Sequence, residues 1–288
     1  MFRSIWRFIT FPFRLFFRWF ANIFRSIRQL LTDEPEDEPL PDTFAKTIEN
    51  PSGVFEHLDA LRKHLLRAVA FLAVATGVSF MFSSHFLDLL AQPVGGIEEL
   101  IAIDVTEPIS VIMRISLLAG FALALPYILL EMWLFVAPGL KKSSRLFSLV
   151  TIPIGVLFFL VGMLFAYFIM LPAAIPFLVT FMGIPTQLRP SNYVRFVTGI
   201  MFWLGIAFEF PLVIYVLARI GLIQAKLLLE QWRLAIVIIA IISAAITPTI
   251  DPVNMALVMG PLIALYFLSI VLAFLAQRGR SSSLESSA

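Results

Sequence analysis

Six long apolar segments fill most of the sequence after residue 64, and none of them contains more than two charged residues. A helix of about 20 apolar residues is long enough to cross the ~30 Å hydrocarbon core of a bilayer. We expect transmembrane helices at 65–83, 109–135, 148–171, 194–218, 233–247 and 253–276. Because 60% of the residues are hydrophobic and only 14% are charged, the chain has too little polar surface for a soluble globule. The predicted fold is therefore an all-α membrane protein, a bundle of six transmembrane helices.

The last two expected helices are predicted to form a hairpin of short helices. Residues 233–247 extend only about 22 Å at 1.5 Å per residue. A tight turn from Thr247 to Pro252 joins them to the final segment. We expect these short helices 5 and 6 to thin the bilayer or to lie toward one side of it.

The basic residues predict how the chain is oriented in the membrane. With these spans, Arg114, Arg189 and Arg195 lie on or near one side, and the other 18 of the 21 Lys and Arg residues (21 − 3) lie on the opposite side. Loops on the cytoplasmic side of membrane proteins carry an excess of Lys and Arg. The sequence therefore predicts that both termini are cytoplasmic.

Three further segments lie outside the expected spans. Residues 1–31 contain six arginines and no acidic residue, and at ~100° per residue the arginines fall within an arc of about 80°. This pattern favours a basic, aromatic, amphipathic interfacial helix, with an Arg-rich organellar transit peptide as the alternative. Residues 32–54 are predicted to be an acidic, Pro-rich linker, and residues 277–288 a disordered cytoplasmic tail. The six-span domain then covers residues 55–276.

The motifs of soluble enzymes are missing from the sequence. There is no Cys, no P-loop and no glycine-rich dinucleotide fingerprint. His57 and His64 are seven residues apart and His85 lies beyond a predicted span, so the three histidines do not form a metal set. We expect no enzymatic activity, no cofactor, no metal ion and no nucleic-acid partner.

Glu209 is the sharpest polar feature inside the spans, where ionisable residues are rare and usually functional. It lies between two phenylalanines, and Pro211 follows it. Since proline has no N–H, the carbonyl of Ala207 loses its helical donor. The combination predicts a hydrophilic notch in an apolar wall. The alternative is an internal pair with Arg114 or another polar group.

Two other acidic residues have weaker signals. Glu131 lies near the inner end of the second span, and we expect its carboxylate to reach toward the cytoplasmic interface. Asp251 precedes Pro252 at the start of the last span, which is a typical capping position.

Several motifs follow one another in a characteristic order. They are His57-Leu58-Asp59-Ala60-Leu61-Arg62, Glu107-Pro108, Ala124-Leu125-Pro126-Tyr127, Glu131-Met132-Trp133, Ala137-Pro138-Gly139-Leu140, Gly162 through Phe168, Phe208-Glu209-Phe210-Pro211, and Thr247-Pro248 through Asp251. Their order and spacing over residues 55–276 resemble the TatC family, subunits of twin-arginine protein translocases.

The resemblance implies a glove-like bundle in the bacterial inner membrane that receives folded proteins bearing twin-arginine signal peptides. It also implies assembly into an oligomer, single-span TatA and TatB partners that dock near helix 5, and export driven by the proton motive force. Glu209 matches the family's intramembrane carboxyl. The implied signal-peptide contacts are Leu58, Asp59, Leu61, Arg62, Pro138, Gly139 and Ser144. The implied partner-interface residues are Thr247, Asp251 and Asn254.

Two positions depart from the family pattern. Ala60 and Ser144 stand where the family usually has the glutamates that contact the two arginines. Asp59 is adjacent but lies ~100° around a helix, which makes it the best-placed remaining acceptor. The first inner loop is basic instead, and we expect its cations to oppose an incoming arginine pair. They are Lys141, Lys142 and Arg145.

These departures leave two alternatives to a signal-peptide receptor. One is a diverged scaffold that binds the single-span subunits without binding signal peptides. The other is an ion-coupled secondary transporter that uses Glu209 and Glu131, although the internal repeats typical of such transporters are not visible in the sequence.

Overall fold

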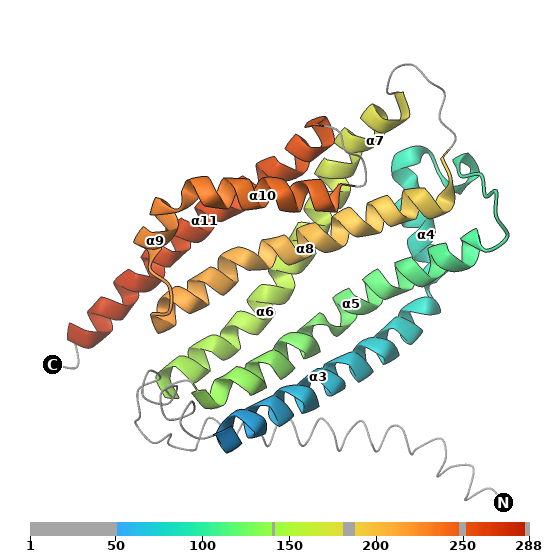
Figure 1. Cartoon of the computed structure of the whole chain (residues 1–288). Coiled ribbons are helices and arrows are strands. Elements are labelled where there is room, and N and C mark those ends of the chain that lie inside the picture. Colours follow the sequence, from blue (N-terminus) through green and yellow to red (C-terminus); the bar gives the residue numbers. More distant parts are fainter. Residues whose placement is uncertain (1–50, 140–141, 181–187, 248–251, 286–288) are drawn as a thin grey trace, which may run out of the picture. The chain divides into compact units, whose positions relative to one another are not determined.

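The computed structural model describes residues 51–139, 142–180, 188–247 and 252–285 of the 288-residue chain (Figure 1). The predicted interfacial helix at 1–31, the linker up to residue 50 and Asp251 lie outside these residues. Apart from one isolated bridge between Leu100 and Leu188, the regular structure of the described part is helical.

The apolar segments form helices close to the predicted spans (Figure 1). The main helices are α3 (Pro51–Phe80), α5 (Glu107–Val136), α6 (Lys142–Phe165), α7 (Leu171–Thr180), α8 (Pro190–Ile220), α10 (Trp232–Ile246) and α11 (Pro252–Glu285). Within the described part, five helical stretches are long and apolar enough to cross a membrane, and α10 is a shorter apolar helix of 15 residues. The prediction of an all-helical membrane protein is confirmed, and α10 has the predicted short length.

Helix α11 differs from the prediction. It is 34 residues long, of which Pro252–Arg278 has the length and composition of a span. Helix 6 is therefore not short, and residues 277–285 are helical where a disordered tail was predicted. Within the predicted span, α11 packs along α8 and α9, where its Ala273 and Ala276 are fully buried. Pro261 lies inside the helix without ending it.

Shorter elements connect the main helices. They are α4 (Ser83–Ala91), η1 (Gln92–Val94), η2 (Ile97–Glu99), η3 (Ala137–Gly139) and α9 (Ala225–Glu230). Gly95 and Gly96 turn the chain between η1 and η2 with φ of +98° and +117°, a region that disfavours residues with a Cβ. Before α5, Asp104 Oδ1 accepts hydrogen bonds of 2.9 Å from both the N–H and the hydroxyl of Thr106. These bonds hold the pKa of Asp104 below its ordinary value.

Helix α6 continues into α7 through a π-helical turn, η4 (Ala166–Met170). The N–H of Leu171 bonds to the carbonyl of Ala166, five residues back. The next residue is Pro172, which has no N–H, so the wider turn accommodates a position that cannot donate. Tyr167 on this turn donates its hydroxyl to the carbonyl of Leu89 at 2.7 Å, and the turn is thereby tied to the end of α4.

The described chain divides into two compact units. The first contains residues 51–67 and 130–150, and the second contains residues 68–129 and 151–285. The large apolar core belongs to the second unit and joins α5, α7 and α8 with α11. Glycines bring α6 and α8 together there: a Cβ on Gly162 would lie 2.8 Å from the carbonyl oxygen of Leu204. Small residues at such crossings are typical of membrane helices.

Candidate functional site

The carboxyl group of Glu209 lies partly buried in the second unit. Its Oε1 atom has no hydrogen-bond partner in the described part of the chain. The predicted alternative, a pair with Arg114, is not found there, and Arg114 lines a separate pocket. A Cβ on Gly155 of α6 would lie 3.0 Å from Glu209 Oε2. Glycine at this position therefore leaves the space that the carboxyl group occupies.

The residues next to Glu209 in sequence and at Gly155 are apolar. Phe208 packs its ring 5.6 Å from that of Phe165, and a Cβ on Gly155 would also lie 3.0 Å from Leu129 Cδ1. Pro211 is fully buried. A buried polar atom without a partner costs about 1–3 kcal/mol. The arrangement can therefore accept a hydrogen bond from a donor that this part of the chain does not supply.

Glu131 lies in the first unit and has a different environment. Its side chain is only 1% exposed, and its Oε2 lies 2.5 Å from Nδ1 of His64. An Arg67 guanidinium nitrogen lies 3.8 Å from the same oxygen. The prediction that Glu131 reaches the cytoplasmic interface is wrong, because partners on α3 hold the carboxylate inside the unit. Phe135, one turn further along α5, stacks on His57 at 4.4 Å and fixes the two helices together.

The predicted signal-peptide residues of α3 lie on its first turns. Asp59 is exposed and its carboxylate lies 2.6 Å from Nζ of Lys63, one turn away. Leu58, Leu61 and Arg62 are also exposed. The structure therefore places an accessible carboxylate and accessible leucines on one short stretch of helix.

Arg145 contacts one of the predicted residues of the first inner loop, Pro138. This side chain is only 4% exposed, and its guanidinium donates to the carbonyl of Pro138 at 3.1 Å. Trp133 donates its indole N–H to Ser148 at 2.8 Å, and Ser148 donates to the Arg145 carbonyl. Arg145 is thus a buried residue whose guanidinium is already engaged within the first unit, and its effect on an incoming arginine pair stays a prediction. Two other predicted loop residues lie in helical turns. They are Gly139 in η3 and Ser144 in α6.

The predicted partner-interface residues are buried in the described chain. Thr247 donates its hydroxyl to the carbonyl of Ser243 at 2.9 Å, and Asn254 is 2% exposed. Their role in a partner interface stays a prediction. No group of three or more metal-ligating side chains occurs in the residues that the structure describes.

Sequence reasoning missed an ion pair and a pocket in the second unit. Arg189 forms a forked contact with the carboxylate of buried Glu107, with Nε 2.8 Å from Oε1. The pocket involves Arg114 and Arg195, which the sequence analysis named as departures from the charge asymmetry, with Arg114 also as a possible partner of Glu209. No local pattern could have joined residues so distant in the sequence.

Comparison with known proteins identifies the family. Residues 56–261 match the family model of the Sec-independent protein translocase protein TatC. The chain belongs to the TatC family. It is a multi-pass membrane protein and not an enzyme.

Curated TatC proteins align with most of this chain. The TatC of Carboxydothermus hydrogenoformans is 34% identical over 228 residues, which cover 78% of this chain and 94% of that protein. The TatC of Deinococcus radiodurans is 35% identical over 229 residues, covering 76% and 85%. A crystal structure of a twin-arginine translocase receptor, TatC, superposes with a TM-score of 0.68 at 34% identity and covers 76% of this chain and 99% of that one.

Proposed function

We propose that this chain is the membrane-embedded receptor subunit of a bacterial twin-arginine translocase. It binds the twin-arginine signal peptides of folded proteins. It lies in the bacterial inner membrane with both termini in the cytoplasm. It assembles with TatA- and TatB-type single-span partners for export driven by the proton motive force. The match to TatC over residues 56–261 supports this function, together with the likeness to a solved translocase receptor.

We assign the arginine contact of the signal peptide to Asp59. Its carboxylate is accessible, whereas Glu131 is buried against His64. A guanidinium binds a carboxylate with two parallel hydrogen bonds, which a lysine ammonium cannot do. Exposed ion pairs one helical turn apart contribute little stability, so an incoming arginine can displace Lys63.

The apolar part of a signal peptide has a matching surface on the same helix. Leu58, Leu61 and Leu65 are exposed, and at ~100° per residue they fall within an arc of about 60°. A signal peptide carries an apolar region of 7–15 residues beyond its basic end. The three exposed leucines therefore suit the apolar region of a signal peptide, and the carboxylate of Asp59 suits its basic end.

Peptide binding tests the proposal. The full chain in detergent is titrated with a labelled twin-arginine signal peptide and with a twin-lysine control of the same charge. We expect several-fold tighter binding of the arginine peptide. Replacement of Ala60→Glu together with Ser144→Glu should tighten it further, because two carboxylates are restored at the family positions. No binding to the native chain, with binding to the double variant, would favour the diverged scaffold.

Cysteine labelling tests the proposed topology, because the native chain has no Cys. Val105, in the turn before α5, is 92% exposed and is a suitable probe site. Val105→Cys should react with a membrane-impermeant maleimide in intact cells. Lys226→Cys in α9 should react only after the cells are opened. Labelling of both from outside would contradict the orientation.

The face of α10 is the proposed docking site for the single-span partners. Leu234, Val237 and Ile241 are exposed and lie on one side of this short helix. Exposed apolar helix faces in a membrane protein contact either lipid or another helix. A photo-crosslinking residue at Ile241 should capture the TatA- or TatB-type subunit, and the same residue at Val105 should not.

A further inference from the structure

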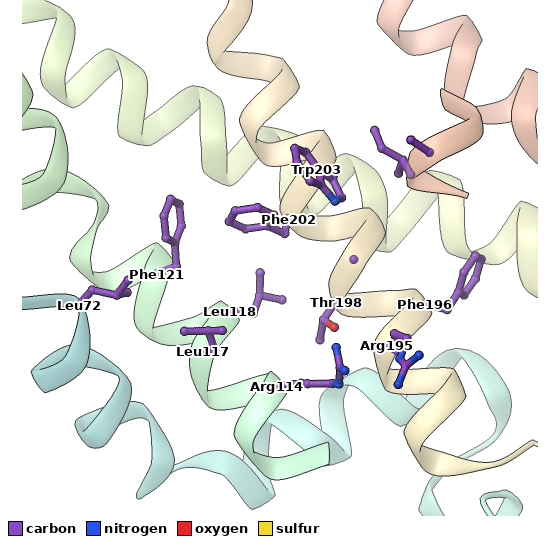
Figure 2. A pocket seen from close by; sticks show the side chains of 13 residues that line it. Leu72, Arg114, Leu117, Leu118, Phe121, Arg195, Phe196, Thr198, Phe202 and Trp203 are labelled. Carbon is purple, nitrogen blue, oxygen red and sulfur yellow. The ribbon is translucent and has the colours of Figure 1, made fainter. Parts of the chain in front are cut away.

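A pocket of about 600 Å³ opens in the second unit between α5 and α8 (Figure 2). Leu72 of α3 and Ile246 of α10 complete its wall. Its lining is divided in two. Figure 2 shows the aromatic rings of Phe121, Phe202 and Trp203 at one end, and the side chains of Arg114 and Arg195 beside Thr198 at the other.

The two arginines have no acidic partner. Neither forms an ion pair in the described part of the chain, and none of the residues that line the pocket is acidic. Arg189, by contrast, is paired with Glu107. Thr198 is buried, and its hydroxyl already donates to the carbonyl of Val194. Two guanidinium groups therefore meet in one apolar pocket with their charge uncompensated.

The arginines lie at similar depths along their helices. Arg114 is seven residues from the start of α5 and Arg195 is five residues from the start of α8, or about 10 Å and 8 Å at 1.5 Å per residue. Helices of 30 and 31 residues are about 45 Å long and exceed the ~30 Å hydrocarbon core, so we expect positions this close to a helix start to lie near the boundary between headgroups and hydrocarbon. The aromatic end of the pocket lies deeper along both helices.

We propose that this pocket binds one anionic phospholipid. The phosphate lies between the guanidinium groups of Arg114 and Arg195, which donate charge-assisted hydrogen bonds to its oxygens. An acyl chain lies along the rings of Phe121, Phe202 and Trp203. The charge and the apolar wall together select an amphipathic anion. A free anion would leave the aromatic end of the pocket unfilled. A zwitterionic lipid would place its own positively charged headgroup near the two arginines.

Lipid retention tests the assignment. The full chain is purified in a neutral detergent, and bound lipid is counted by native mass spectrometry after addition of phosphatidylglycerol or phosphatidylcholine with the same acyl chains. We expect preferential retention of one phosphatidylglycerol. The double variant Arg114→Gln and Arg195→Gln should lower its affinity by about tenfold, to the level of phosphatidylcholine. Circular dichroism checks that the variant remains helical.

Lys226→Gln is the control for the loss of a positive charge outside the pocket. This side chain is highly exposed on α9, outside the pocket, and its removal should leave lipid retention unchanged. Equal loss in this control, or unchanged retention in the double arginine variant, would overturn the proposal. Displacement of the lipid by glycerol phosphate at equal concentration would also overturn it, by showing that the acyl chain contributes nothing. If the double variant kept the lipid but no longer co-purified with the TatA- or TatB-type partner, the proposal would be overturned and the pocket would be a helix-docking site.

Discussion

Glu131 and Glu209 are both glutamates inside apolar helices, yet their surroundings differ completely. In the first unit, Glu131 is almost fully buried and contacts His64 at 2.5 Å. In the second unit, one carboxyl oxygen of Glu209 is buried without a hydrogen-bond partner in the described chain. Both residues invite a functional interpretation from the sequence, Glu209 more strongly than Glu131, because acids are rare in spans.

The difference separates a structural role from a binding role. A carboxylate whose partners are already in place stabilises the fold, and removing it leaves those partners exposed to an apolar environment. A carboxyl group that lacks a donor does not stabilise the fold, and it gains free energy only when a donor arrives. We therefore expect substitutions of the two residues to affect different measurements.

Glu131→Ala should have the largest effect on stability. Removing this buried carboxylate would leave His64 without its 2.5 Å partner, which should cost about 3 kcal/mol. Thermal unfolding of the purified chain in detergent measures the loss. Glu131→Gln should cost only about 1 kcal/mol, because the amide oxygen can still accept a hydrogen bond from His64. Equal stability of Glu131→Ala and the native chain would show that the contact is not structural.

Glu209→Ala should have the largest effect on transport. We expect the export of a folded reporter with a twin-arginine signal peptide to fall by roughly tenfold, the value of one strong hydrogen bond. The amount of inserted protein and its unfolding temperature should stay close to those of the native chain. Glu209→Gln should be milder, since an amide can still take part in hydrogen bonds. If Gln were as inactive as Ala, the proton-carrying transporter would become the better interpretation.

The sequence predicted where these two residues lie but not what they contact. Runs of apolar residues place α8 and α10 within a few residues of the prediction, because a span needs a fixed number of such residues. The partner of Glu131 is 67 residues away in the sequence, and no local pattern indicates that distance. The same limit applies to Gly155, which defines the space around Glu209 from another helix.

Helix ends were harder to predict than helix interiors. α3 begins at Pro51, although the apolar run starts much later, because an amphipathic first half with its Asp59–Lys63 pair continues the helix into the first unit. α11 continues to Glu285, beyond the end of its apolar run at residue 276. Both helices therefore extend beyond the length that a bilayer requires, and the apolar run alone does not predict where they end.

Asp59 is a third carboxylate for the comparison, one that is exposed and only weakly paired, and Asp59→Asn removes its charge. We expect several-fold weaker binding of a twin-arginine signal peptide, with no change in unfolding temperature, because Asp59 contacts only Lys63 in the described chain. Lys63→Gln is the matched variant and should bind the peptide slightly more tightly, since it removes the competing cation. Unchanged peptide binding in Asp59→Asn would exclude Asp59 as the acceptor.

Gly155→Ala should have the smallest effect, and it tests the space around Glu209 directly. Alanine is favoured over glycine inside a helix by about 1 kcal/mol, and Gly77→Ala should gain about that much because no atom lies within 4 Å of its added Cβ. At Gly155 the new methyl group would stand 3.0 Å from both Glu209 Oε2 and Leu129 Cδ1. Both atoms are at the ends of flexible side chains, so they can move by a few tenths of an ångström. The movement should cancel most of the gain and leave the unfolding free energy within about 0.5 kcal/mol of the native value.

The same substitution should lower transport, because the displaced carboxyl group no longer presents its free oxygen in the native position. Gly77→Ala should transport normally, and the pair therefore separates a general effect of added helix stability from a local effect on Glu209. Full transport by Gly155→Ala would mean that the position of this carboxyl group is not critical. A loss of transport in Gly155→Ala at unchanged stability would show that transport depends on the exact position of the Glu209 carboxyl group.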